Sequence, residues 1–291
     1  MIRTGVRHEM AIRHLTVAAT VRLTPNMVRV TLTGDELTGF VSLGPTDHVK
    51  LFFPDPATGV LTTPQLTPDG VRRPTDAVII SRDYTPRAFR ADAAGGPELD
   101  VDFVLHPSTD SRGAGAEGGI AAGEDANGGP ASAWASRAQA GDPLAVAGPR
   151  GSRLVPDDAE NVVLIADETA LPAFSRWLEL LPAEARITGI LDVADEDAEA
   201  YLTHEQRARA SIEVLYRIDG PGQLEESVRS LDLDDDTYVW AAGEANGLVP
   251  VRRYLRHELG IENDRLSVEG YWRRGVTNLD HHAPIDPSDP D

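Results

Sequence analysis

Apolar and polar residues alternate in short runs through the first third of the chain. The runs at 17–23 and 28–32 each place an apolar side chain at every second position, and a Thr-Pro-Asn turn separates them. Further apolar runs at 48–53, 77–80 and 100–105 lie between segments that contain proline or glycine. Many short strands of this kind predict a small antiparallel β-barrel.

The second half of the chain instead alternates continuous apolar runs with helical patterns. The first run, at 161–166, is followed by an apolar helical face over 171–181. Continuous apolar strands are typical of a parallel sheet that is buried on both faces. We therefore predict two domains, an N-terminal antiparallel β-barrel over residues 1–155 and a C-terminal α/β doubly wound parallel sheet over residues 156–291. Similar runs recur at 187–193, 212–216, 238–242 and 266–268.

Two segments lack the apolar residues of a core. Residues 107–129 consist mainly of glycine, alanine and acidic residues, and cannot bury enough surface to offset their ordering entropy. We predict a flexible surface loop inserted in the first domain, because strand-like sequence resumes at 143–147. The last residues of the chain, rich in proline and aspartate, are predicted to form a mobile tail.

Composition narrows the possible partners. The 291 residues include no cysteine, which excludes disulfides and thiolate chemistry, and the net charge of -20 argues against nucleic acid. Residues 1–155 carry 15 basic and 17 acidic side chains, whereas the remaining residues carry 12 and 30, so the first half is the better host for an anionic ligand. No apolar run is long enough for membrane insertion and the N-terminus has no apolar signal core, so we expect a cytoplasmic protein.

An arginine, an aromatic residue and a hydroxyl follow the apolar run at 77–80. Arg82 can pair a diphosphate, Tyr84 offers a ring face, and Thr85 offers a donor and an acceptor to ring heteroatoms. This combination suits a flat, anionic, redox-active ligand; the alternative is an exposed polar strand edge.

Residues 129–141 predict a helix that begins with small residues and a serine. Such a helix start suits phosphate, but it is also ordinary helix capping.

Two predicted strand ends in the second domain suit a dinucleotide. After the first strand, Thr169 and the backbone amides around it can hold a diphosphate, although Asp167 and its neighbour are otherwise ordinary helix-end charges. The acids at 192–197 lie where an adenosine ribose is expected. They favour a free 2′-hydroxyl, and hence NADH over NADPH, unless they only face water.

Neither a fixed metal site nor a hydrolase is predicted. The histidines lack the spacing of metal ligands, and the chain has no nucleophile elbow. Lys50 is the only lysine among 27 basic residues, which is either chance or a position that requires a compact ammonium.

Eight motifs occur in an order that resembles a known family. They are Arg82-x-Tyr84-Thr85-Pro86-Arg87, Val101-Asp102-Phe103-Val104-Leu105-His106, Gly129-Pro130-Ala131-Ser132-x-Trp134-Ala135, Gly141-Asp142, Gly148-Pro149-Arg150-Gly151, Asp167-Glu168-Thr169-Ala170-Leu171-Pro172, Trp240-Ala241-Ala242-Gly243-Glu244 and Gly270-Tyr271-Trp272-Arg273-Arg274-Gly275. Together they resemble the siderophore-interacting protein family of FAD-dependent ferric-siderophore reductases, within the ferredoxin–NADP reductase-like superfamily. The resemblance covers nearly the whole chain apart from the Gly/Ala loop and the last residues.

The resemblance implies that the first domain binds FAD. Arg82 would pair the FAD diphosphate, Tyr84 would pack on the isoalloxazine or ribityl region, and Thr85 would lie near flavin N5. The other residues implied to hold or support FAD are His106, Ala131, Ser132 and Trp134.

The resemblance also implies a hydride donor, NADH or NADPH, on the second domain. Asp167, Thr169 and Gly243 stand in the motifs that would bind it. Ala166 departs from the family, whose members often have glycine before Asp-Glu-Thr, and the loop before Gly129 is longer than expected.

The implied substrate is a ferric siderophore, a small anionic iron chelate. Lys50 matches the lysine of the family's His-Val-Lys strand, and Arg273 and Arg274 follow its Tyr-Trp pair. These cations would bind the chelate, and Lys50 and Thr85 are the candidate catalytic residues. Two rival functions remain: a flavin oxidoreductase that serves a ferredoxin or free flavin, and a non-catalytic siderophore-binding protein.

Overall fold

The computed structural model describes residues 3–105, 129–219, 222–279 and 283–290. The chain forms two compact units, Val6–Ser152 and Arg153–Asp291 together with Met1–Gly5. The predicted flexible loop, apart from Gly129, and the predicted FAD residue His106 lie outside the described residues.

The unit Val6–Ser152 is built on a seven-stranded antiparallel sheet with the order β7-β4-β10-β2-β3-β9-β8. Its strands are β2 (Ile12–Thr24), β3 (Met27–Thr33), β4 (Val49–Phe53), β7 (Ile80–Tyr84), β8 (Pro86–Arg90), β9 (Glu98–Val104) and β10 (Pro143–Ala147). Two short pairs accompany it, β5 (Gln65–Thr67) with β6 (Gly70–Arg72) and β1 (Gly5–Arg7) with β11 (Gly151–Arg153). The helical elements of this unit are η1 (Asp35–Leu37) and α1 (Gly129–Ala135).

The apolar alternation in β2 and β3 gives the sheet one buried face. The two strands pair with Val17 opposite Leu32, and both side chains are buried. The register of β2 shifts twice, near Val17 and near Thr24, and such irregularities bend a strand and increase its twist. The sheet is therefore curled around its apolar face.

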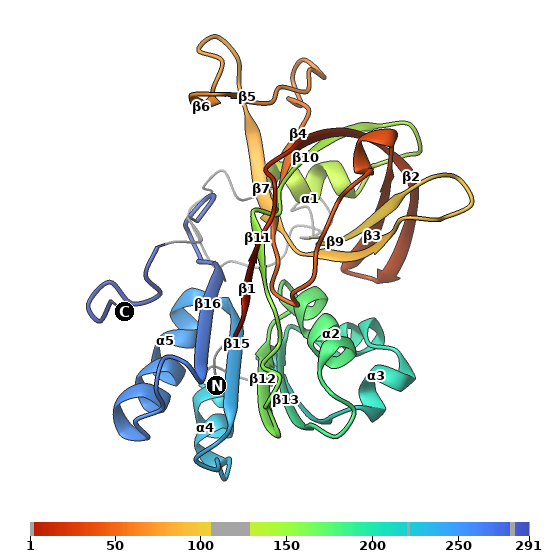
Figure 1. Ribbon diagram of the computed structural model, residues 1–291. Helices are drawn as coiled ribbons and strands as arrows, with labels where there is room; N and C mark the ends of the chain where they lie inside the picture. Colours follow the sequence, from red (N-terminus) through yellow and green to blue (C-terminus); the bar gives the residue numbers. More distant parts are fainter. Residues whose placement is uncertain (1–2, 106–128, 220–221, 280–282, 291) are drawn as a thin grey trace, which may run out of the picture. The chain divides into compact units, whose positions relative to one another are not determined.

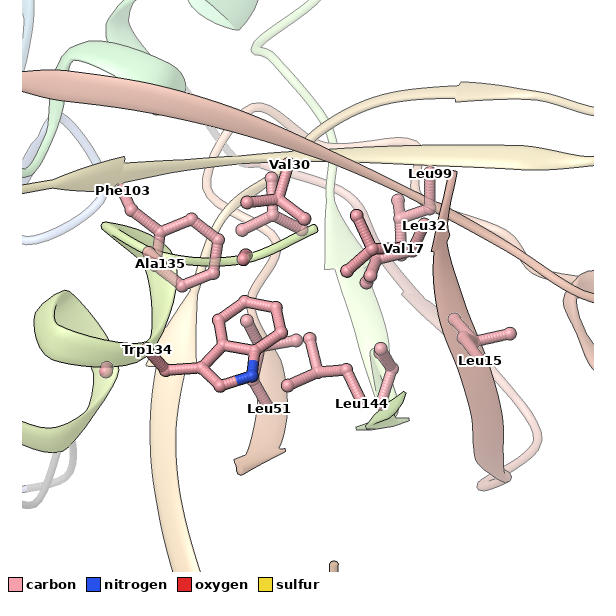
Figure 2. Packing of buried hydrophobic residues seen from close by; sticks show 14 of the residues in the cluster. Leu15, Val17, Val30, Leu32, Leu51, Leu99, Phe103, Trp134, Ala135 and Leu144 are labelled. Carbon is pink, nitrogen blue, oxygen red and sulfur yellow. The ribbon is translucent and has the colours of Figure 1, made fainter. Parts of the chain in front are cut away.

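The helix α1 contributes to the core of this curled sheet. Its Trp134 is 6% exposed and lies among apolar side chains from several strands (Figure 2). Those labelled in the figure include Leu51 of β4, Phe103 of β9 and Leu144 of β10. Because α1 packs against β4, β7 and β9, its position is fixed relative to the predicted FAD strand, β7.

The second unit contains a five-stranded parallel sheet with the order β14-β13-β12-β15-β16. Its strands are β12 (Asn161–Ala166), β13 (Arg186–Val193), β14 (Ser211–Tyr216), β15 (Tyr238–Glu244) and β16 (Leu266–Trp272). Its helical elements are α2 (Leu171–Leu180), η4 (Glu196–Tyr201), α3 (His204–Ala208), η5 (Arg217–Asp219), α4 (Gln223–Ser230), α5 (Ala245–Arg253) and η6 (Tyr254–Glu258).

Helices cover both faces of this parallel sheet, α4 and α5 on one side and α2 and α3 on the other (Figure 1). The first side packs Val228 and Leu248 against Ile165 and Ala241 in one apolar cluster. Strand order reverses direction at β12, because β13 lies on one side of it and β15 on the other. This reversal is the point at which doubly wound sheets bind ligands.

The predicted two-domain fold is confirmed. The first unit is a curled antiparallel sheet, and the second is a doubly wound parallel sheet. The predicted mobile C-terminal tail lies partly outside the described residues, at 280–282 and 291. Within residues 283–290, Ile285 and Asp286 are only 8% and 5% exposed, so this part of the tail packs against the unit. The proline- and aspartate-rich composition of the tail did not indicate that Ile285 attaches it to the unit.

Candidate functional site

The predicted FAD residues of the first unit lie at the end of β7. Tyr84 packs its ring against Phe103, with ring centroids 4.4 Å apart, and against Phe53 at 6.5 Å. Burial raises the pKa of the Tyr84 hydroxyl, so this side chain stays neutral and acts as an aromatic surface. Thr85 follows directly and is 7% exposed, while Arg82 is half-buried and donates from Nη1 to the Ser81 carbonyl at 2.8 Å.

The helix α1 brings the second group of predicted residues to the same place. Trp134 shares the aromatic neighbours of Tyr84, with centroids 5.9 Å from Phe103 and 5.5 Å from Phe53. Ala131 and Ser132 lie one turn earlier and are each 6% exposed. The sequence-distant segments 82–85 and 131–134 are therefore joined by one aromatic cluster.

The chemistry of this donor set fits FAD. The set consists of a guanidinium on Arg82, a neutral ring on Tyr84 and hydroxyls on Thr85 and Ser132. They are carried by β7, the residue that follows it, and α1, which packs against β7. Arginine and hydroxyl groups are suited to a diphosphate, and aromatic faces to a fused ring system. Their assignment as individual FAD contacts stays a prediction.

Lys50 lies on the opposite face of the sheet from Arg82 and Tyr84. In the pairing of β4 with β7, Lys50 is opposite Asp83, while its neighbour Leu51 is opposite Arg82. Side chains alternate between faces along a strand, so Lys50 and Asp83 share the face away from Arg82 and Tyr84. The Lys50 ammonium lies 2.7 Å from Asp83 Oδ1 and 2.8 Å from Oδ2, and its side chain is 34% exposed. The predicted chelate-binding lysine is thus neutralised locally by a carboxylate.

At the end of β12 the Asp167 carboxylate is buried and fully hydrogen-bonded. Its Oδ1 accepts from the Thr169 amide at 2.9 Å, the Thr169 hydroxyl at 2.5 Å and the Ala170 amide at 3.3 Å. Its Oδ2 accepts from the Trp272 indole at 2.7 Å. Burial raises the pKa of Asp167 to about 6, with a smaller contribution from Glu168. The carboxylate therefore connects the end of β12 to the end of β16.

Gly243 lies beside Asp167 at the end of β15. A Cβ atom at this position would come within 2.7 Å of Asp167 Cγ and Oδ2, and the backbone φ of +151° also disfavours other residues.

A small hollow of about 20 Å³ opens beside Gly243, lined from β12, β13, β15 and neighbouring helices. Its position at the reversal of strand order, next to free strand ends, fits a dinucleotide. The hollow is lined by Ile165, Ala166, Asp167, Asp192, Leu224, Ala242, Gly243, Glu244, Gly247 and Leu248.

Sequence reasoning missed an arginine at the neighbouring strand ends. Arg217, directly after β14, donates from Nη2 to both Glu168 carboxylate oxygens at 2.7 Å. Its Nη1 contacts the Asp192 carbonyl and lies 4.0 Å from the Asp192 carboxylate. Partial burial is the largest effect on Asp192 and raises its pKa, against the opposing effect of Arg217. An arginine, the type of cation that a 2′-phosphate would need, therefore lies beside one of the acids expected to select NADH. The signal available in the sequence was the position of Arg217 directly after an apolar run.

The two arginines predicted to bind the chelate differ in their surroundings. Arg273 is half-buried and donates from Nη2 to the Ile285 carbonyl at 2.7 Å. Arg274 is exposed, and its backbone amide donates to Glu244 Oε1 at 3.0 Å. Arg273 is thus held by the C-terminal segment, whereas the side chain of Arg274 is open to solvent.

Within the described ranges, no group of three or more histidine, cysteine or carboxylate side chains is arranged to hold a metal ion. Among the helices that the structure describes, none is long and apolar enough to cross a membrane.

Family models match both units of the chain. Residues 16–153 match the siderophore-interacting FAD-binding domain, and residues 159–275 match the siderophore-interacting protein domain. The chain belongs to the siderophore-interacting protein family. The resemblance inferred from the eight motifs is therefore confirmed, and the family model for the first unit includes Arg82, Tyr84 and Thr85.

Relatives of known role match over most of their length. The NADPH-dependent ferric-chelate reductase of Escherichia coli is 31% identical over 92% of this chain and 95% of its own. The ferric vibriobactin reductase ViuB of Vibrio cholerae is 30% identical over 88% of each chain.

Solved structures of similar proteins have the same architecture. A siderophore utilization protein from T. fusca is 38% identical, with a TM-score of 0.80 over 97% of this chain and all of its own. The siderophore-interacting protein SipS from Aeromonas hydrophila is 30% identical, with a TM-score of 0.69 over 94% of each chain. The FAD/NAD-binding part of a Vibrio cholerae nitric oxide dioxygenase, at 15% identity and a TM-score of 0.60, shares the fold.

Proposed function

We propose that this protein is an FAD-dependent ferric-siderophore reductase that takes hydride from NADPH. The observation that carries the proposal is the β7 end, where Arg82 and Tyr84 lie on a strand that packs against α1 and Thr85 follows directly, in a chain of the siderophore-interacting family. The relatives named as NADPH-dependent ferric-chelate reductase and ferric vibriobactin reductase support this activity.

FAD, when bound, would couple a donor of two electrons to a ferric ion that accepts one. The role of the chain is to bind and orient. Arg82 would hold the diphosphate by paired hydrogen bonds, and Tyr84 would present its neutral ring face. The Thr85 hydroxyl, next in the chain, would hydrogen-bond a ring heteroatom and so orient the ring system.

The substrate would be a ferric chelate with hard oxygen ligands. Reduction lowers the charge of the iron, and such ligands hold ferrous iron less tightly, so reduction releases it. The predicted cations, Lys50 on the first unit and Arg273 and Arg274 on the second, would each attract an anionic chelate, because a charge acts on a ligand at short range even when the net charge of the protein is negative.

NADPH is the proposed donor in place of the NADH suggested by the acids at 192–197. The relative from Escherichia coli is named for NADPH, and Arg217 supplies a cation beside Asp192. A reduced ferredoxin as an alternative donor stays a prediction.

The proposal is tested by anaerobic steady-state assays of the FAD-loaded protein with a ferrous-specific chromogenic chelator. NADPH should support ferrous iron formation from a ferric tris-catecholate complex at a higher kcat/KM than NADH or reduced ferredoxin does. Activity with free riboflavin alone would instead identify a flavin reductase. Binding of the ferric complex without its reduction would identify a carrier.

A further inference from the structure

The C-terminal segment, residues 283–290, is attached to the second unit by one apolar anchor. Ile285 is 8% exposed and belongs to the apolar cluster of β15, β16 and α5. It packs over Gly270, where an added Cβ would come within 3.2 Å of Ile285 Cγ1 and 3.0 Å of Ala245 Cβ. The glycine that opens the Gly-Tyr-Trp-Arg-Arg-Gly motif therefore leaves the space in which this segment docks.

Two carboxylates attach the same segment to the end of α5. Asp286 accepts from Arg253 Nε at 2.7 Å, and its own carboxylate also orders the Ser288 amide and hydroxyl. Asp289 accepts from Arg252 Nη1 at 2.6 Å and contacts His257 Nε2 at 2.7 Å. Each pair combines a buried partner with a more exposed one: Asp286 is 7% exposed against 52% for Arg253, and Arg252 is 5% exposed against 30% for Asp289. Networked pairs of this kind, each with one buried partner, hold more firmly than isolated surface pairs.

Between these anchors the segment reaches Arg273. The Ile285 carbonyl accepts a hydrogen bond from Arg273 Nη2 at 2.7 Å. The backbone before Arg273 is fixed by the Trp272 indole on Asp167, and its own carbonyl accepts from the Val276 amide at 3.0 Å. The tip of this arginine is therefore held by the backbone of the buried Ile285, and its base follows a tryptophan that is hydrogen-bonded to the buried Asp167.

We propose that residues 283–290 act as a strap that positions the Arg273 guanidinium for the ferric chelate. The inference rests on the proposed function, in which Arg273 contacts the chelate. A guanidinium has five N–H donors in a rigid fork. The strap occupies one on Nη2 and Nε is buried, so the donors left for a ligand are those of Nη1 and the second one on Nη2. An arginine ordered before binding loses less side-chain entropy when the ligand arrives, which strengthens binding. Asp286 and Asp289 are thus positioning residues that act through Arg273.

The test is a double-mutant cycle between the strap and Arg273. The strap variant carries Asp286→Asn and Asp289→Asn, and it is measured with and without Arg273→Ala. The matched control carries Asp232→Asn and Asp235→Asn, which remove the same charge from exposed positions of the same unit. Equilibrium dialysis of the FAD-loaded proteins with a ferric tris-catecholate complex gives the dissociation constants.

We expect the strap variant to bind the complex about fivefold more weakly than wild type, and the control to bind as wild type does. In the Arg273→Ala background the strap substitutions should have no further effect. FAD content and the NADPH-dependent bleaching of the flavin spectrum should be unchanged. If the double strap variant does not fold, Asp286→Asn alone, next to Ile285, supplies the same comparison.

Equal weakening in both backgrounds, or no weakening in either, would overturn the strap while leaving the proposed function intact. Failure of the wild-type protein to bind or reduce any ferric complex would overturn the proposed function and the strap with it. The measurement on the wild-type protein therefore distinguishes failure of the strap proposal from failure of the proposed function.

Discussion

At the scale of single residues, the pairing of Lys50 with Asp83 bears on chelate binding. The two side chains are direct cross-strand partners, and both are partly open to solvent. An ammonium held by a carboxylate attracts an anionic ligand less strongly than a free ammonium does. Asp83, the residue between Arg82 and Tyr84, therefore tunes the charge that Lys50 offers.

We expect Asp83→Asn to strengthen binding of a triply anionic ferric tris-catecholate, by about 1 kcal/mol or roughly fivefold, the scale of partly exposed pairs. Lys50→Ala should weaken the same binding and leave FAD bound. An uncharged ferric tris-hydroxamate should respond less to either change, because the effect is electrostatic. Titration of the FAD-loaded variants with both complexes at low ionic strength measures this. Weaker binding of the anionic complex by Asp83→Asn would show that Asp83 orients Lys50 instead.

The residue types that suit FAD could be recognised from sequence, but their partners could not. Arg82, Tyr84 and Thr85 are close together in the sequence, so their suitability for FAD can be recognised without knowledge of the fold. The partnership of Lys50 with Asp83 depends on the register of β4 against β7, over thirty residues apart. Arg217 was missed for a related reason: its place beside Glu168 and Asp192 follows from strand order in the sheet.

At the scale of elements, the hydrogen bond from Trp272 to Asp167 joins the ends of β16 and β12. Burial raises the pKa of Asp167 from 3.8 to about 6, so the folded protein holds this proton more tightly than the unfolded chain. The resulting stabilisation is complete below about pH 4 and is lost as the pH rises through about 6. A shift of this size corresponds to about 3 kcal/mol.

Replacing Asp167 should therefore change the pH dependence of stability. Between about pH 4 and pH 6, the free energy of unfolding of wild type should fall by about 3 kcal/mol relative to that of Asp167→Asn. Urea unfolding at a series of pH values measures the difference, with Asp197→Asn, an exposed acid, as control. Parallel profiles for wild type and Asp167→Asn would contradict the raised pKa.

Element types followed from sequence more readily than element contacts. The continuous apolar run of β12 is typical of a strand buried on both faces, and the alternating runs of β2 and β3 are typical of strands buried on one face. These strands could therefore be predicted from sequence. The strap could not, because a proline- and aspartate-rich segment resembles a disordered tail. Its order depends on Ile285 meeting the space above Gly270 and on arginines of α5, none of which is local.

At the scale of the whole molecule, one chain carries two units with separate cores and separate chemistry. The curled sheet carries the groups suited to FAD, and the parallel sheet carries a strand-order reversal suited to a dinucleotide. Family models match both units, which agrees with a reaction that requires two different ligands. The uneven charge fits this division, since the near-neutral first half is the better host for anionic FAD.

The most direct test of this account is anaerobic stopped-flow spectroscopy of the FAD-loaded protein. The protein is first bleached with stoichiometric NADPH and then mixed with a ferric tris-catecholate complex and a ferrous-specific chelator. The account predicts that the oxidised flavin spectrum returns as two ferrous ions form per FAD, because hydride supplies two electrons and each iron accepts one. A spectrum that stays bleached in the presence of the ferric complex, with no ferrous iron formed, would contradict it.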